Sequence, residues 1–341
     1  MRPLYYGRLC FGSGWMVHTS GMRPLARQLT RLKVQRAGLG ILLAGLACAA
    51  TAGWAQSSRP AQGRTHAADW QHAVNHAKST APDARVLVVE IGSGRVLASA
   101  HLAEAGGTLA TPGSTLKPLI LYFALAAGRW GAERRVACSR QLRIGSHQLN
   151  CSHPPAEPMD AEQALTWSCN SYFAELAGTL EPEELRRALS ERGLLAATGL
   201  APRESVAAFR QPRNRTEVQL AALGLEGIRV TLPELAEAYR SLAIELAAHA
   251  ETAAARTVRA GLADSASYGM AGAAALGGVP IEGKTGTASP ESGGASHGWF
   301  VGLAPADSPR VVVAVYLPAG HGSDAAQVAA SVLALSPLRK P

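Results

Sequence analysis

The sequence predicts an α+β fold, in which an antiparallel β-sheet is flanked by helices and joined to a mostly helical subdomain. Strand-like runs lie towards both ends of the chain, and a long region with helical periodicity separates them. The chain has 341 residues, of which 47% are hydrophobic and 17% are charged. Such a chain can bury a sizeable core, and its composition excludes a disordered or collagen-like polymer.

The first 55 residues resemble an export signal. They carry seven Lys or Arg and no Asp or Glu, and the uncharged stretch 37–55 follows the basic run. A positive flank, an apolar core and small residues are the order of a cleaved signal peptide, although nineteen uncharged residues also just reach the length of a membrane anchor. Translation can start at Met1 or at Met22, where MRPL recurs. Either interpretation places the rest of the protein in the periplasm or on the outer face of the inner membrane.

The basic leader also explains the formal net charge of +8. The remainder of the chain is nearly neutral and has no cluster of Lys and Arg that could follow a phosphate backbone. We therefore expect no nucleic-acid binding. Residues 56–82 begin with a polar, small-residue stretch and are predicted to be a linker, so that the folded domain spans residues 83–341.

The elements of the domain follow in order. Residues 86–91 and 95–98 are rich in β-branched and aliphatic residues and enclose a Gly-Ser-Gly turn, which predicts a hairpin. A helix is predicted to begin near Ser114, because an apolar face follows Pro112-Gly113. Residues 160–242 are predicted to be mostly helical, with turns near Gly193, Gly199 and Gly227.

The C-terminal part of the domain has three strand-like runs and a helix. The strand-like runs are 281–287, 299–303 and 310–316, which are spaced for hairpin pairing. Residues 323–335 have the pattern of a closing helix. Strands from both ends of the chain are therefore expected to meet in one sheet.

Three short motifs carry the chemistry. Each alone is weak, but their order and their expected elements make the combination specific. They are Ser114-Thr115-Leu116-Lys117, Ser168-Cys169-Asn170 and Lys284-Thr285-Gly286-Thr287.

The first two motifs can activate a serine. A serine hydroxyl needs a base, and a lysine three residues along a helix lies on the same face, so Lys117 is the predicted base for Ser114. Burial and the nearby charge of Lys284 would lower the pKa of Lys117. Ser168 could pass the proton towards the leaving amine, and the Asn170 amide could orient both Lys117 and a substrate peptide.

The third motif suits the edge of a sheet. Such an edge can bind an extended peptide, with Gly286 allowing close approach and with Lys284, Thr285 and Thr287 holding a carboxylate. The backbone N–H groups of Ser114 and Thr287 are the predicted oxyanion hole.

These motifs resemble the three signatures of penicillin-binding proteins and serine β-lactamases. The similarity to the penicillin-binding protein transpeptidase domain extends to residues 164–173, 230–236 and 297–302, and it covers about residues 83–337. It implies a D,D-transpeptidase that acylates Ser114 with a peptidoglycan stem peptide ending in D-Ala-D-Ala. It also implies binding of β-lactam antibiotics and contact with other cell-wall synthesis proteins.

Two enzymatic alternatives and one binding alternative remain open. A D,D-carboxypeptidase or a β-lactamase would pass the acyl group to water, and a non-catalytic sensor or scaffold would keep only the fold. Residues 181–185 resemble the deacylating glutamate segment of one β-lactamase class, but they begin only eleven residues after Asn170, and an acidic first turn with Pro near its start is typical of a helix start. His297 is expected to satisfy a backbone group rather than to contact substrate.

The mechanism requires no metal and no cofactor, and we expect neither. Cys138 and Cys151 could form a disulfide in an oxidising compartment, and Cys169 is interpreted as a small buried side chain. A zinc site made of Cys138, His147, Cys151 and His153 is the competing interpretation, although its spacing matches no compact zinc-binding pattern.

Overall fold

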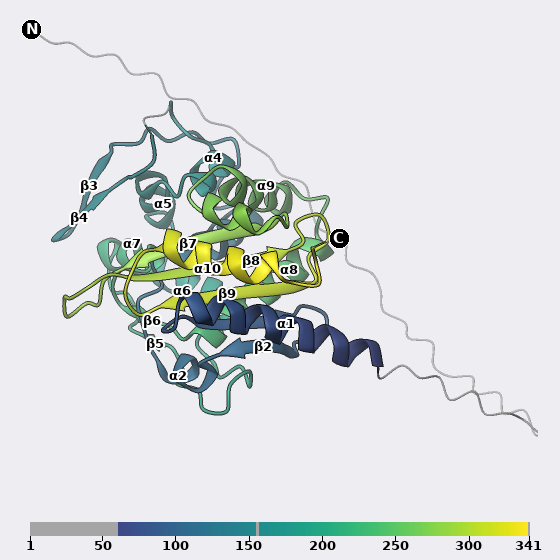
Figure 1. The fold of residues 1–341 in the computed structure, drawn as a ribbon. Helices are drawn as coiled ribbons and strands as arrows, with labels where there is room; N and C mark the ends of the chain where they lie inside the picture. The colour runs from purple at the N-terminus through teal and green to yellow at the C-terminus, as the bar shows by residue number, and fades with distance from the viewer. Residues whose placement is uncertain (1–60, 155–156, 340–341) are drawn as a thin grey trace, which may run out of the picture. The chain divides into compact units, whose positions relative to one another are not determined.

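A five-stranded antiparallel sheet organises the domain, as the computed structural model in Figure 1 shows. The model describes residues 61–154 and 157–339. The sheet order is β2-β1-β9-β8-β7, so that the N-terminal hairpin pairs with the C-terminal strands. The predicted α+β class is confirmed. The strands of this sheet are β1 (Arg85–Glu90), β2 (Val96–Ala100), β7 (Glu282–Ala288), β8 (His297–Ala304) and β9 (Val311–Leu317).

Alternating side chains of the sheet point into two hydrophobic cores. In β9, for example, Val313 and Val315 belong to one core and Val312 and Ala314 to the other. This follows from the two-residue period of a strand and explains why both faces of the central strands β8 and β9 are buried. The sheet is therefore a buried middle layer with helices on both faces.

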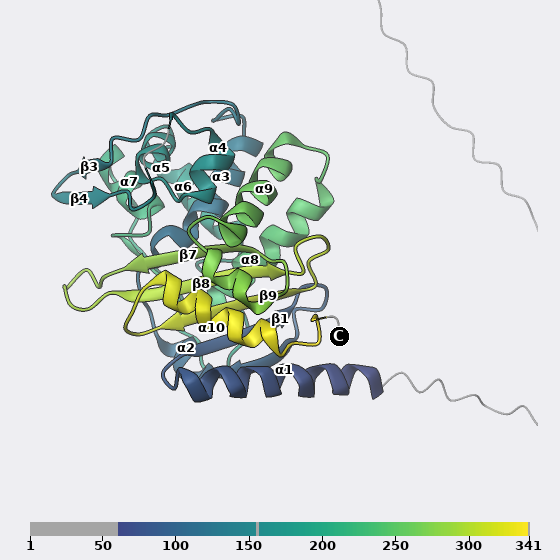
Figure 2. The ribbon, with the colours of Figure 1, turned by 45° about the horizontal axis from the view of Figure 1, so that its top comes forward.

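The smaller core lies beneath helices from the two ends of the domain. They are α1 (Ala61–Thr80), α10 (Gly322–Ala334) and the short 3₁₀ helix η2 (Gly272–Gly277). Figure 2 shows α1 and α10 lying across the same face of the sheet.

The larger core joins the opposite face of the sheet to a helical subdomain. Helix α8 packs against β1, β8 and β9, and α9 packs against β7. The elements outside the five-stranded sheet and the smaller core's helices are α2 (Leu102–Gly107), η1 (Gly113–Leu116), α3 (Lys117–Ala126), β3 (Gln141–Ile144), β4 (His147–Asn150), α4 (Ala161–Thr166), α5 (Asn170–Ala177), α6 (Pro182–Ser190), β5 (Ala208–Phe209), α7 (Arg215–Ala222), β6 (Ile228–Arg229), α8 (Leu232–Ala248) and α9 (Ala253–Ser267).

The predicted linker over residues 56–82 is wrong for most of its length, because α1 occupies residues 61–80. Trp70, Ala73, Val74 and Ala77 recur at helical spacing and are buried against the sheet and α10. The apolar stripe has only these four residues, and the many polar residues around them make it hard to recognise in the sequence. The helical region also extends beyond the predicted residue 242, through α8 and α9.

The leader over residues 1–55 lies outside the described residues, so the prediction of a signal peptide or anchor stays a prediction. Among the helices that the structure describes, none combines the length and the apolar character needed to cross a membrane.

Replacing Trp70 with alanine tests whether α1 is part of the domain. Trp70 is 2% exposed, so Trp70→Ala should lower the free energy of unfolding by about 3 kcal/mol or more. His72→Ala, on the exposed face of the same helix, should leave it nearly unchanged. Denaturant unfolding of both variants measures the difference. A loss as small as that of the control would mean that α1 does not contribute to the core.

Candidate active site

The turn that carries Ser114 is tightly wound. Ser114 lies in the 3₁₀ helix η1, and the backbone N–H of Lys117 donates to the Ser114 carbonyl where α3 begins. Side chains three residues apart eclipse each other in a 3₁₀ helix, so this turn places Ser114 and Lys117 in one line. The predicted helix start near Ser114 is therefore correct, with a 3₁₀ turn instead of an α-helical one.

Buried polar side chains from other elements hold this turn. The Trp299 indole N–H donates to the Thr111 carbonyl oxygen at 2.9 Å, and His297 Nε2 lies 2.8 Å from the same oxygen. The Tyr239 hydroxyl donates to the Thr115 carbonyl at 2.9 Å. Burial lowers the pKa of His297, so that its neutral form bonds this carbonyl.

The structural interpretation of His297 is thus correct. Sequence analysis missed the role of Tyr239, since a tyrosine in a helix gives no sign of a partner that lies 124 positions away.

The Lys117 amine donates hydrogen bonds to two residues of the second motif. Its Nζ donates to Asn170 Oδ1 at 2.7 Å, to the Ser168 carbonyl at 2.8 Å and to Ser168 Oγ at 3.1 Å. Within the described part of the chain, these three acceptors take the three hydrogens of a charged amine, and the Ser114 hydroxyl is not among them. Losing one proton would free a lone pair for Ser114.

Lys284 from the third motif reaches the same hydroxyl. Its Nζ donates to Ser168 Oγ at 2.9 Å and to the Thr285 carbonyl at 3.0 Å. Ser168 thus bridges two lysines from the start of α3 and the middle of β7, which are 167 positions apart in the sequence. The three motifs predicted from the sequence meet at this point.

Burial controls the charge state of both lysines. Each side chain is fully inaccessible to solvent. Desolvation lowers the pKa of Lys117 to about 8 from 10.5, although the Cys169 and Cys151 thiols oppose this shift. Desolvation, and then the charge of Lys117, hold the pKa of Lys284 well below its usual value. The pair therefore favours a state in which at least one amine is neutral near neutral pH.

Ser168 lies in a strained turn between α4 and α5, and Asn170 is the first residue of α5. Ser168 has a φ of 54°, a left-handed conformation that is uncommon for a residue with a side chain. The Asn170 amide donates to the Asn150 carbonyl at 3.1 Å, while its oxygen accepts from Lys117. One of its two amide hydrogens remains for another acceptor.

Strand β7 is the last strand of the sheet, as predicted for the third motif. The predicted role of Gly286 changes, however. A Cβ atom at this position would lie 2.5 Å from the Pro112 carbonyl oxygen and 2.9 Å from Thr115 Cγ2. Gly286 therefore admits the Ser114 turn itself. Gly113, on the Ser114 turn, likewise admits strand β7, because a Cβ atom at this position would lie 2.8 Å from the Thr287 carbonyl oxygen.

The two threonines differ in availability. Thr287 is exposed, but its hydroxyl accepts a hydrogen bond from the Gly322 N–H at 2.9 Å. Thr285 is buried, and its hydroxyl lies 3.4 Å from the Met270 carbonyl oxygen. The backbone of Thr287 lies beside the Ser114 turn, which is the placement required by the predicted oxyanion hole.

The disulfide that Cys138 and Cys151 could have formed is not present in the structure. Cys138, Cys151 and Cys169 are all free. The competing zinc interpretation named His147, but its ring bonds Glu226 at 2.9 Å, whereas Cys138, Cys151, His153 and Cys169 form a compact group. Spacing could not show this, since Cys169 enters the group from a different element.

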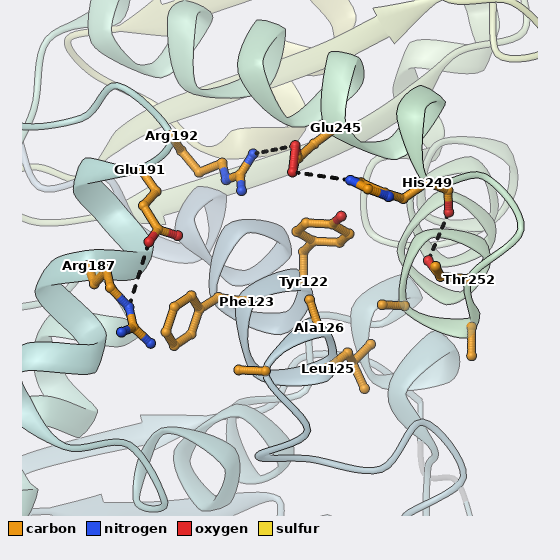
Figure 3. A pocket seen from close by; sticks show the side chains of 13 residues that line it. Tyr122, Phe123, Leu125, Ala126, Arg187, Glu191, Arg192, Glu245, His249 and Thr252 are labelled. Carbon is orange, nitrogen blue, oxygen red and sulfur yellow. Dashed lines mark hydrogen bonds and ion pairs between the residues drawn. The ribbon is translucent and has the colours of Figure 1, made fainter. Parts of the chain in front are cut away.

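A separate pocket of about 600 Å³ opens among α3, α6, α8 and α9, as Figure 3 shows. Its ionisable side chains face one another: Arg192 and His249 both face Glu245, and Arg187 faces Glu191. Its lining contains no residue of the three motifs.

Comparison with known proteins gives one family and a set of similar folds. Residues 85–334 match the family model described as the penicillin binding protein transpeptidase domain. The chain is 27% identical over 237 residues to the probable peptidoglycan D,D-transpeptidase PenA of Neisseria gonorrhoeae, and 28% identical to that of Neisseria meningitidis serogroup B. Each match covers 62% of this chain and 40% of the relative, so the chain spans less than half the length of these relatives.

Two solved structures have a similar fold. The apo structure of the TP domain from Burkholderia pseudomallei penicillin-binding protein 3 superposes with a TM-score of 0.70 at 22% identity, covering 81% of this chain and 96% of that one. A peptidoglycan glycosyltransferase from Burkholderia ambifaria gives 0.68 at 22% identity, covering 80% and 94%.

Substituting Gly286 tests the close packing of β7 against the Ser114 turn. Gly286→Ala should lower the free energy of unfolding by roughly 1–3 kcal/mol, because the added methyl group overlaps the Pro112 carbonyl. Gly92→Ala is the matched control, since a Cβ atom there meets nothing within 4 Å. Denaturant unfolding of the two variants compares them. Equal stability would contradict the close contact.

Proposed function

The chain belongs to the penicillin-binding protein transpeptidase domain family, and on this premise we propose that it is a serine D,D-transpeptidase of peptidoglycan. Its substrates would be stem peptides ending in D-Ala-D-Ala. The observation that carries the proposal is the meeting of three motifs at Ser168 Oγ, which accepts from both Lys117 and Lys284.

Acylation begins with the loss of the Ser114 proton. Neutral Lys117 accepts this proton while Ser114 Oγ attacks the carbonyl carbon of the penultimate D-Ala. The tetrahedral oxyanion would lie against the backbone N–H groups of Ser114 and Thr287. Oriented donors of this kind stabilise the charge that develops in the transition state, and each typically contributes about 3 kcal/mol.

Collapse of the tetrahedral species breaks the peptide bond and needs a proton on the leaving nitrogen. Ser168 is placed to deliver it, because its hydroxyl accepts from Lys117 and can rotate to donate to the amine of the departing D-Ala. Lys284 keeps this hydroxyl in place at 2.9 Å, and its amine can donate a hydrogen bond to the carboxylate of the substrate. The product is an ester on Ser114 and free D-Ala.

Deacylation reverses these roles. The amine of a second stem peptide attacks the ester carbonyl and loses a proton to Lys117 through Ser168, and the Ser114 oxygen leaves and recovers its proton. The new peptide bond is the cross-link. An extended peptide would run along β7, the last strand of the sheet.

Hydrolysis of the acyl-enzyme, as in a D,D-carboxypeptidase or a β-lactamase, is the alternative outcome. Glu181, which resembles a deacylating glutamate, caps α6 in a reciprocal box with Glu184. Glu184 in turn bonds Arg129. The segment is thus a helix start, as expected, which supports transpeptidation over the β-lactamase alternative.

The proposal includes location and partners. The domain would act outside the inner membrane, delivered by the leader, and would bind β-lactam antibiotics as substrate analogues and cooperate with other cell-wall synthesis proteins. As a scaffold or sensor, by contrast, it would work without its nucleophile. Complementing a strain deficient in cross-linking with Ser114→Ala separates these functions, because only a scaffold tolerates the loss.

Covalent labelling tests the nucleophile. Incubation with a penicillin should give an adduct on Ser114 that persists, observed by intact-protein mass spectrometry. Ser114→Ala should abolish the adduct, and Ser168→Ala should slow its formation about 100-fold or more. Ser190→Ala, an exposed serine at the end of α6, is the control. Rapid release of penicilloate would favour a β-lactamase, and an adduct on Ser114→Ala would exclude this nucleophile.

The pH dependence of acylation tests the base. Below pH 8 the Lys117 amine is mostly charged and cannot accept a proton, because its pKa is about 8. The labelling rate should therefore rise about tenfold per pH unit well below pH 8 and level off above it. Stopped-flow kinetics with a fluorescent penicillin measure the profile. A rate that still climbs steeply beyond pH 9 would indicate a lysine with its usual pKa of 10.5.

A further inference from the structure

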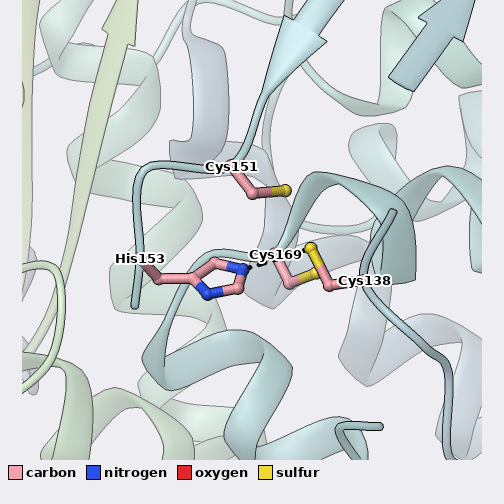
Figure 4. A group of neighbouring side chains, drawn as sticks. All are labelled: Cys138, Cys151, His153 and Cys169. Atoms are coloured by element: carbon pink, nitrogen blue, oxygen red, sulfur yellow. Dashed lines mark hydrogen bonds between the residues drawn. The ribbon is translucent and has the colours of Figure 1, made fainter. Parts of the chain in front are cut away.

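We propose that Cys138, Cys151, His153 and Cys169 bind a structural zinc ion beside the Ser168 loop (Figure 4). One ligand atom from each residue lies within 4.8 Å of the others. Cys138 precedes β3, Cys151 and His153 follow β4, and Cys169 is the N-cap of α5. Three thiols and an imidazole are one of the usual ligand sets of structural zinc.

The spacing of the donor atoms fits the ion. Zinc–sulfur and zinc–nitrogen bonds in a tetrahedron imply an S···N separation of about 3.6 Å. Cys138 Sγ lies 3.5 Å from His153 Nε2. Cys151, His153 and Cys169 are buried and Cys138 is half-buried, so the group is shielded from water on most sides.

The second nitrogen of His153 is bonded as in metal-binding histidines. With its proton on Nδ1, the ring donates to the Pro154 carbonyl oxygen at 2.6 Å, which leaves the Nε2 lone pair directed at Cys138. The Arg140 guanidinium lies 3.4 Å from the same Nδ1 and donates to the His153 carbonyl oxygen. Arg140 thus brings a positive charge to the edge of the group.

The surroundings favour thiolates, which are the form that binds zinc. The Asn170 N–H donates to Cys151 Sγ at 3.3 Å, and the Arg140 N–H donates to Cys138 Sγ at 3.4 Å. Cys169 lies at the N-terminus of α5, where the helix dipole favours negative charge. Three thiolates and one Zn²⁺ leave a net charge of −1, which Arg140 can balance.

Such an ion would support a weak part of the fold. Strands β3 and β4 form a two-stranded sheet separate from the main one, and their side chains are mostly exposed or half-buried. An isolated hairpin of this kind is marginally stable on its own. A zinc ion would tie both ends of the hairpin to Cys169 and so fix Ser168 and Asn170, the neighbours of Cys169.

A disulfide between two of the cysteines is the competing state. It would leave one thiol and His153 without a role, whereas a metal uses all four converging groups. The two states also differ in the number of cysteine thiols that can be alkylated. The zinc site leaves three such thiols after the metal is removed, whereas a disulfide leaves one.

Metal analysis of the full-length chain tests the proposal. After gel filtration, inductively coupled plasma mass spectrometry should find about one zinc ion per chain. His153→Ala and Cys138→Ser should lose most of it. The matched control is His147→Ala, a histidine of the same hairpin that faces Glu226 instead of the cysteines. The control should retain the zinc of the wild-type chain.

A second measurement does not depend on how the variants fold. Replacing zinc in the wild-type chain with Co²⁺ should produce the visible absorption of a tetrahedral cobalt–thiolate site, and removing the metal should lower the Tm by several degrees. Zinc content equal to background, or mass spectrometry showing a disulfide among the three cysteines, would overturn the proposal.

The rate of penicillin labelling is a third readout. Unlike the metal content and the cobalt spectrum, it depends on the proposed function. Metal removal should slow labelling of Ser114, because Ser168 and Asn170 lose their support. Zinc without any labelling would leave the metal site intact and refute the transpeptidase, whereas labelling without zinc would do the reverse.

Discussion

Two lysine amines buried against a single serine hydroxyl impose the main constraint on this protein. Removing a charged amine from water is costly unless it is fully hydrogen-bonded or gives up its proton. Lys117 and Lys284 meet this requirement through Ser168, the Asn170 oxygen and backbone carbonyls. Their burial brings an ordinarily protonated side chain close to the pH at which it can act as a base.

The packing of the sheet against the Ser114 turn satisfies this constraint. Lys284 reaches Ser168 from the last strand of the sheet, so β7 must approach η1 closely. Gly286 and Gly113 permit this approach, because a side chain at either position would collide with the opposite backbone. Trp299, His297 and Tyr239 then fix the carbonyls on both sides of Ser114. The buried aromatic layer of the larger core thus positions Ser114 as well as stabilising the fold.

The loop of the second motif depends on a different support. Ser168 has a left-handed backbone conformation, which persists only where neighbouring contacts hold it. On one side these contacts are the two lysines. On the other side they come through Cys169 and Asn170, which contact Cys151 and the end of β4. The small hairpin therefore belongs to the structure of the site, although it lies outside the main sheet.

Much of this protein could be predicted from local sequence. Strand periodicity predicted the hairpin and the C-terminal strands, and the order of three short motifs predicted the family and the residues that meet at Ser168, because such patterns depend on residues that are near in sequence. Helix α1 was missed because its apolar stripe has only four residues among many polar ones. Only the tertiary structure decided that Gly286 faces the Ser114 turn, that Tyr239 anchors it and that Cys169 replaces His147 beside His153. These contacts join separate elements, and the side chains that meet are chosen by the packing of the sheet and the subdomain, which spacing along the chain does not encode.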